Sequence, residues 1–198
     1  MQQRGDAALK KAQTDRRIQR TRQALHGALV ELILEKGFEK VTVQDVIDRA
    51  NIGRSTFYLH YRDMEDLLLG GFENLWVLLE HHLVGDAVPA ASVWDLSLVV
   101  FQHAQRYTKV HKAVIGKQSG RLMFAHLHTY LSVLIRERLK HRWSKNTPVP
   151  LDFVVHHLTS SLISSLTWWL DHDMPCSPEQ MNAMFRQLTQ PAIDAMSD

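Results

Sequence analysis

The stretch TVQDVIDRANIGRSTFYLHYRDMEDLL, residues 42–68, decides the fold. Apolar residues recur in it at helical spacing, and an Asn-Ile-Gly turn interrupts the pattern. Thr42 is a favourable N-cap with Asp45 three positions later, so a helix is predicted over 43–50. A second helix is predicted over 54–60, because Asn tolerates the left-handed conformation of a turn and Gly can cap the helix that follows.

Two short helices joined by three residues and braced by a longer preceding helix have the layout of a helix-turn-helix. The preceding helix is predicted from Arg16 to Lys36, with Gly37 as its stop. Phe57 and Tyr61, four positions apart, are expected to anchor the second short helix in the core. Such a helix fits the major groove of DNA, where its N-terminal residues meet base edges.

The side chains of the second helix that are left outside the core can all donate hydrogen bonds to phosphates or bases. They are Arg54, Ser55, Thr56, Tyr58 and His60. The chain before them is basic: residues 1–62 contain 12 Lys and Arg against 7 Asp and Glu, whereas residues 63–198 contain 11 against 14. A basic end on a mildly acidic body favours a phosphate-bearing partner, although a solvated basic face gives the same count.

Residues 42–68, with the ending Glu35-Lys36-Gly37-Phe38 before them, resemble the DNA-binding region of the TetR family of bacterial regulators. The resemblance covers about residues 16–84 and rests on the combination of Thr42, the Asn-Ile-Gly turn, Ser-Thr-Phe-Tyr and Tyr61. It implies that Thr42 and Tyr58 bind phosphate. It also implies that four further positions face the major groove, namely Arg54, Ser55, Thr56 and His60.

Two positions depart from the family pattern. Asn51 stands where a glycine is common in the turn, which is a physically mild change. Met64 stands where a lysine is common at the start of the next helix, and this removes one expected phosphate contact. Arg62 is the neighbouring residue that we expect to supply it. Contact of the N-terminal segment with DNA stays open beside the alternative of a solvated tail; its basic residues are Lys10, Lys11, Arg16, Arg17, Arg20 and Arg22.

Helical periodicity continues to the end of the chain and no useful stretch alternates like a strand, so the predicted fold is all-α with about nine helices. The expected parts are a flexible basic tail over 1–15, the helix-turn-helix domain over 16–62, a connecting helix over 63–84 and a C-terminal domain over 85–198. Residues 85–89, Gly-Asp-Ala-Val-Pro, are the expected linker.

The resemblance implies that the C-terminal domain binds a ligand and that its last two helices pair with those of a second copy. Residues 151–171 are apolar on more than one face, and such a helix needs two partners. Trp168 and Trp169 are adjacent, so they point about 100° apart and are not expected to share one core. The expected dimer-interface residues are Leu162, Trp168, Trp169 and Phe185; the alternative, that both tryptophans are intramolecular, stays open.

A small-molecule effector is expected in the C-terminal domain, whose middle is rich in His and aromatic residues. The candidate pocket residues are His103, Tyr107 and Phe124, each of which fits a core or surface position as well. No cofactor is expected. No metal site is expected either, because neighbouring histidines such as His156 and His157 diverge on a helix.

Other signals bound the function. Cys176 is the one cysteine of the chain, which favours a reducing, cytoplasmic setting, and no apolar run is long enough for a membrane span. No phosphate loop, nucleophile elbow or metalloprotease motif indicates an enzyme. The expected function is a transcriptional regulator, a ligand-released repressor that binds a palindromic operator as a homodimer. The alternative is an architectural or division-linked DNA-binding protein without an effector.

Overall fold

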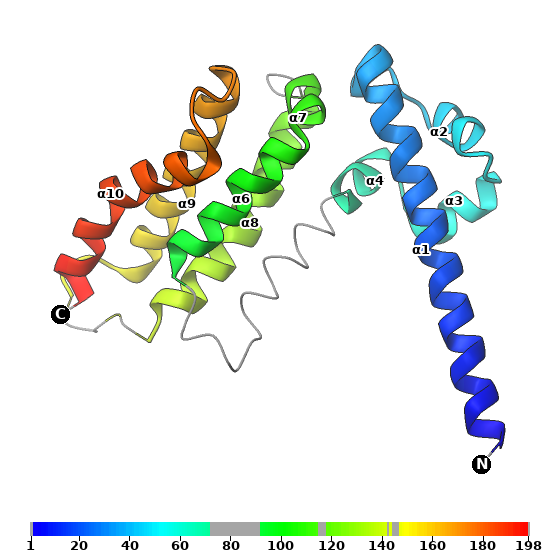
Figure 1. The fold of residues 1–198 in the computed structure, drawn as a ribbon, viewed down its shortest axis with the longest axis horizontal. Helices are drawn as coiled ribbons and strands as arrows, with labels where there is room; N and C mark the ends of the chain where they lie inside the picture. The colour runs from blue at the N-terminus through cyan, green and yellow to red at the C-terminus, as the bar shows by residue number, and fades with distance from the viewer. Residues whose placement is uncertain (1, 72–91, 115–117, 142, 144–146, 198) are drawn as a thin grey trace. The chain divides into compact units, whose positions relative to one another are not determined.

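The computed structural model describes residues 2–71, 92–114, 118–141, 143 and 147–197 (Figure 1). Within these ranges the chain forms nine α-helices, one 3-10 helix and no strand, so the predicted all-α class is confirmed. The chain divides into two compact units, Met1–Gly71 and Phe72–Asp198. The expected linker over 85–89 and most of the expected connecting helix over 63–84 lie outside the described residues.

The first unit contains α1 (Gln2–Lys36), the 3-10 helix η1 (Phe38–Lys40), α2 (Val43–Ala50), α3 (Arg54–His60) and α4 (Met64–Gly70). The bounds of α2 and α3 are those predicted from the sequence. Local chemistry sets them. Thr42 caps α2, Asn51 ends it with φ at 52°, and Asp63 caps α4 by accepting the N–H of Asp66.

α1 differs from the prediction at its start. It begins at Gln2 rather than Arg16, so the expected flexible tail over 1–15 is helical from its second residue. The prediction of a flexible tail rested on the polar and basic character of this segment. Residues 2–15 are nevertheless mostly Gln, Ala, Leu, Lys and Arg, which favour a helix by intrinsic propensity. Figure 1 shows this half of α1 extending beyond α2 and α3.

The core of the first unit draws on α1 to α4. α1 packs on α2 and α4, and α2 packs on α3. Phe57 is fully buried and Tyr61 nearly so, which confirms both as the anchors of α3. The other buried apolar side chains of these four helices are Leu25, Ala28, Leu29, Leu32, Ile33, Val46, Ile47, Leu67 and Leu68.

The second unit contains α6 (Val93–Arg106), α7 (Thr108–Val114), α8 (Gln118–Leu139), α9 (Leu151–Asp171) and α10 (Pro178–Ser197). α8 lies along α9, and α6 lies along α10 (Figure 1). α9 has the predicted bounds. A capping box starts α10, since the side chains of Ser177 and Gln180 each accept the backbone N–H of the other residue.

One apolar core holds the second unit together, with the side chains of Leu96, Phe101, Leu131, Ile135, Leu162 and Trp169 among its most buried members. Buried polar contacts join α6 to α10. The indole of Trp94 donates to the Thr189 hydroxyl at 3.0 Å, and the Ser97 hydroxyl donates to the Asn182 side chain. None of the described helices is both long and apolar enough to cross a membrane.

Two glycines of the first unit give opposite expectations. A Cβ at Gly70 would lie 2.9 Å from Cε1 of Tyr61, a ring fixed by burial. Gly70→Ala should therefore lower the free energy of unfolding by about 1–3 kcal/mol. A Cβ at Gly27, in α1, meets nothing within 4 Å, so Gly27→Ala should raise it by about 0.5–1 kcal/mol. Urea denaturation of the full chain measures both; equal effects would contradict this packing of Gly70.

Candidate nucleic-acid interface

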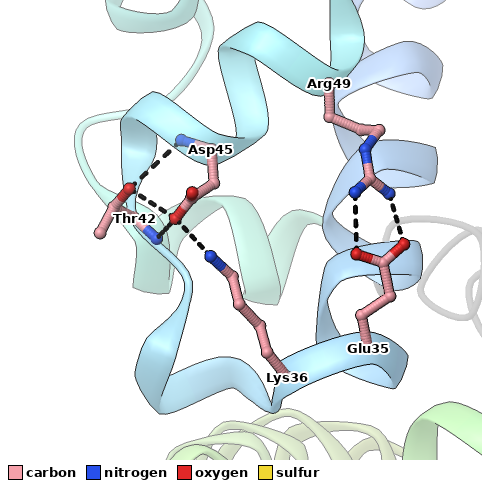
Figure 2. Close-up of polar contacts among 5 residues, drawn as sticks. All are labelled: Glu35, Lys36, Thr42, Asp45 and Arg49. Carbon is pink, nitrogen blue, oxygen red and sulfur yellow. Dashed lines mark hydrogen bonds and ion pairs between the residues drawn. The ribbon is translucent and has the colours of Figure 1, made fainter.

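The N-terminus of α2 is fixed by a network around Asp45 (Figure 2). The Thr42 hydroxyl accepts the Asp45 N–H at 3.2 Å and donates to the Asp45 carboxylate at 2.6 Å. The Thr42 N–H donates to the same carboxylate at 2.8 Å, and the Lys36 Nζ lies 2.8 Å from it. The predicted capping box is confirmed, with Lys36 as a member that the sequence did not indicate.

This network stabilises the ionised form of Asp45. The hydrogen bond from Lys36, followed by those from Thr42, holds the pKa of the Asp45 carboxyl well below its ordinary value of 3.8. The Thr42 side chain is exposed, as the expected phosphate contact requires. The Thr42 hydroxyl already bonds the N–H and the carboxylate of Asp45, however. A phosphate bound at this position would therefore share this hydroxyl with the Asp45 carboxylate.

A second ion pair joins the end of α2 to α1. The Arg49 guanidinium donates two bonds to the Glu35 carboxylate, both at 2.8 Å (Figure 2). Its Nη1 also lies 3.1 Å from Glu31. The hydrogen bond from Arg49 lowers the pKa of Glu35. Bidentate pairs of this kind fix orientation as well as distance. Arg49 therefore acts within the protein, although its charge alone would suit a phosphate contact.

α3 presents a clear division between a buried and an exposed side. Phe57 faces the core, whereas Arg54, Ser55, Tyr58 and Leu59 are exposed. Thr56 and His60 were also expected to face the major groove. Both are half-buried and lie at the sides of the exposed face. Arg54, Ser55 and Tyr58 thus lie on the outward face as expected. Leu59 lies there as well. It was not predicted, because the candidates on this helix were limited to hydrogen-bond donors.

The polar residues around α3 differ in charge. The Arg54 guanidinium lies over the Tyr58 ring, 5.9 Å from its centroid. Burial, followed by the charge of Arg22, lowers the pKa of His60, so its neutral form prevails at pH 7 and the ring can offer a hydrogen bond but no charge. Arg62 is strongly exposed and lies 3.5 Å from Asp66, one turn later.

The C-terminal end of α3 is held against α1. The Tyr61 hydroxyl and the His26 Nε2 are 3.0 Å apart, and the two rings meet edge to face. The Arg22 guanidinium lies 5.8 Å from the centroid of the same Tyr61 ring. Arg22 thus joins the end of α3 to the basic part of α1, whose residues Arg16, Arg17 and Arg20 are exposed.

The candidate pocket residues of the second unit lie in two places. His103 and Tyr107 are in ring contact at the end of α6, with centroids 4.6 Å apart, and His111 of α7 lies 6.1 Å from His103. Burial, followed by the charges of His111 and Arg106, lowers the pKa of His103 to about 4, so this ring is neutral at pH 7. Phe124 is a half-buried residue of α8 that packs against the core.

The expected dimer interface needs correction at three of its four residues. Leu162, Trp169 and Phe185 are buried within a single chain and have almost no surface left for a partner. The Trp169 ring packs edge to face on Phe101, and its indole N–H donates to the Cys176 carbonyl at 2.9 Å. Trp168 points outward, 47% exposed, and remains a candidate. The 100° offset of the two tryptophans therefore separates core from surface.

Comparison with known proteins identifies this arrangement. The family model for bacterial regulatory proteins of the tetR family matches residues 26–70, which include α2, α3 and α4. A second model, for a transcriptional regulator C-terminal region, matches residues 96–191. This chain belongs to the tetR family of bacterial regulatory proteins. Members of this family are DNA-binding regulators of transcription rather than enzymes.

Individual relatives agree with the tetR assignment. The uncharacterized HTH-type transcriptional regulator YxbF of Bacillus subtilis (strain 168) is 43% identical over 60 residues, or 30% of this chain and 16% of that protein. The TetR transcriptional regulator of Streptococcus agalactiae 2603V is 28% identical, with a TM-score of 0.61 over 90% of this chain and 98% of that one. The chain spans less than half the length of the curated relatives it matches.

A more distant solved structure shares the fold. FadR from Bacillus subtilis, solved in complex with stearoyl-CoA, is 16% identical to this chain. The likeness has a TM-score of 0.58 and covers 84% of this chain and 96% of that one. The fold of this chain therefore also occurs in a transcriptional regulator that shares little sequence identity with it.

The Asp45 network predicts an acid-sensitive α2. Because the folded-state pKa of Asp45 lies below its ordinary value, its ionised form contributes stability that is fully present above about pH 4 and fades as pH falls further. Asp45→Asn should therefore be less stable than wild type at pH 7, and the difference should shrink below pH 4. Asp48→Asn, on the exposed side of the same helix, is the control. A difference between wild type and Asp45→Asn that is independent of pH, measured by chemical denaturation from pH 3 to 7, would rule this out.

Proposed function

We propose that this DNA-binding regulator is a ligand-released repressor that binds a palindromic operator as a homodimer in the cytoplasm. The observation that carries the proposal is the outward face of α3, formed by Arg54, Ser55 and Tyr58 on a helix whose opposite side is anchored by Phe57. A narrow helix with donors on one face and a fixed base is the form in which a protein reads the major groove. The proposed DNA-binding domain spans 16–62.

Roles within this interface follow from charge and exposure. Arg54 supplies a charged donor near the start of α3, where a recognition helix meets base edges. Tyr58 donates its exposed hydroxyl to a phosphate, and Arg62 replaces the family lysine that is absent at Met64. Ser55, Thr56 and the neutral His60 offer hydrogen bonds without charge. Thr42 contacts phosphate from the start of α2, beside the helix end that favours anions.

A second copy is required because one seven-residue helix reads few base pairs, whereas two related by a twofold axis read a palindrome. We assign the pairing to exposed apolar stripes on α9 and α10. Phe153 and Trp168 lie on one face of α9 with Ser164 between them, and a small residue there permits close approach of a partner helix. The stripe on α10 consists of Met184 and Leu188, and the Leu188 side chain is 82% exposed.

The effector would bind in the second unit, within the proposed domain over 85–198. His103 and Tyr107 form one candidate edge of its site, and Phe124 is the third candidate. FadR of Bacillus subtilis, which shares the fold, was solved with stearoyl-CoA, and this supports a small molecule with a large apolar part as the kind of effector. Release requires that the effector bind the DNA-free conformation more tightly than the DNA-bound one.

DNA recognition is tested by selecting binding sites from random double-stranded DNA and titrating the selected site at several salt concentrations. We expect a palindromic consensus. Arg54→Gln should weaken binding and reduce the slope of log affinity against log salt by about one, if Arg54 contacts phosphate. If it contacts a base instead, specificity at that position should relax by about 1–3 kcal/mol. Either result supports the assigned face.

Arg49→Gln is the matched control for this experiment. Arg49 is bound to Glu35 and Glu31, so its loss should weaken binding through displacement of α2 while the salt slope stays at the wild-type value. Failure to enrich any sequence, with Arg54→Gln binding as wild type does, would contradict sequence-specific regulation. That outcome would favour an architectural DNA-binding protein without an effector.

The dimer is tested with Leu188→Glu. Each protomer would lose the burial of one leucine, worth about 1.5–3 kcal/mol, so the dissociation constant should rise about 100-fold or more. Val133→Glu is the control, because Val133 is also an exposed apolar residue but lies on α8, outside both stripes. Sedimentation of the free protein measures both. A wild-type monomer, or a Leu188→Glu variant that dimerises normally, would refute the α9–α10 pairing.

A further inference from the structure

Leu59 has an unusual position for an apolar residue. It is 81% exposed, the highest value among the large apolar side chains described in the first unit. A single exposed leucine on a protein surface ordinarily needs no explanation. Leu59, however, lies on α3, the helix whose exposed side is the DNA-binding face, and α3 has only seven residues.

The helix geometry places Leu59 on this face, next to Ser55 and Tyr58. Ser55 and Leu59 are one turn apart, and Tyr58 lies beside them at the intervening i+3 position. All three are exposed, and Phe57 on the opposite side is fully buried. A face that brings Ser55 and Tyr58 against DNA therefore brings Leu59 against DNA as well.

The major groove offers one apolar group to such a side chain. Thymine presents its C5-methyl group there, and the other three bases present donors and acceptors without a methyl. Leucine has no hydrogen-bonding group, so it cannot recognise phosphates, sugars or the polar edges of the bases. If leucine lay against the polar edge of a base, it would displace the water bound there without replacing its hydrogen bonds. This loss lowers the affinity for a half-site with the wrong base.

We propose that Leu59 is a specificity-determining residue that recognises the C5-methyl group of a thymine in each operator half-site. The inference rests on the proposed function, because it requires that α3 read sequence. Burial of one methyl-sized group contributes about fourfold in affinity, so the two half-sites of a dimer together contribute about fifteenfold.

The test uses deoxyuridine, which pairs as thymidine does but lacks the methyl group. The selected operator is synthesised with each symmetric pair of thymidines replaced in turn, and the affinity of the full chain for each duplex is measured. Wild type should lose about fifteenfold at one pair of positions. Leu59→Ala should bind the unmodified operator about as weakly as wild type binds that duplex, and it should be insensitive to the replacement.

Leu34→Ala is the matched control, since Leu34 is an exposed leucine of α1 in the same unit. It should keep both the affinity and the methyl dependence of wild type. The slope of log affinity against log salt should be the same for wild type and Leu59→Ala, because no phosphate contact is lost.

Several results would overturn the inference while leaving the proposed function intact. They are a selected operator without thymine in its half-sites, sequence-specific binding that no deoxyuridine replacement weakens, and a methyl dependence that Leu59→Ala retains. Failure to select any operator would instead remove the proposed function and this inference together. Because Leu59 is exposed, its replacement leaves no cavity, so loss of binding cannot be traced to unfolding.

Discussion

A helix of seven residues cannot maintain itself in water, because its few internal hydrogen bonds do not offset the cost of nucleation. α3 therefore depends on what its buried side touches. Phe57 and Tyr61 provide that support, and the Tyr61 hydroxyl binds His26 of α1. The glycine at position 70 lets α4 approach the same ring. The direction in which the DNA-binding face points follows from the packing of these two aromatic rings.

The charges of the first unit are divided between two tasks. Lys36 and Arg49 are each paired with carboxylates and secure the two ends of α2. Arg54 extends outward from α3 instead. The 12 basic residues over 1–62 thus outnumber the cations that are available to phosphates, because Lys36 and Arg49 are held by carboxylates of the same domain. Added salt screens exposed, unpaired charges more than paired ones. The first unit should therefore stay folded at salt concentrations that weaken its attraction to phosphates.

Most of the fold could be predicted because its helices begin and end at residues with strong local preferences. Thr42, Asn51 and Asp63 set boundaries that the structure reproduces. The start of α1 could not be predicted from an apolar pattern, because residues 2–15 favour a helix by composition rather than by an apolar stripe. The sequence also could not show which apolar residues of α9 meet the core of their own chain, since that depends on contacts far apart in sequence.

The exposed face of α3 was predicted in outline from the hydrogen-bond donors on a short helix. Arg54 and Tyr58 lie where the pattern placed them, whereas His60 lies at the flank and Leu59 takes an outward position. Sequence patterns treat an apolar residue in a helix as core by default, which hides an apolar residue that faces a partner. The pairings of Lys36 and Arg49 have no sequence signature at all, because each partner choice depends on the angle between α1 and α2.

The contact between Arg54 and Tyr58 bears on the entropy of recognition. In the free protein the guanidinium already lies over the ring, so each side chain narrows the range of rotamers open to the other. Ordering a long side chain at an interface ordinarily costs about 0.5–1.5 kcal/mol. Part of that ordering is complete before any duplex arrives. The proposed DNA-binding face is in this sense preorganised, because Arg54 and Tyr58 restrict each other in the free protein.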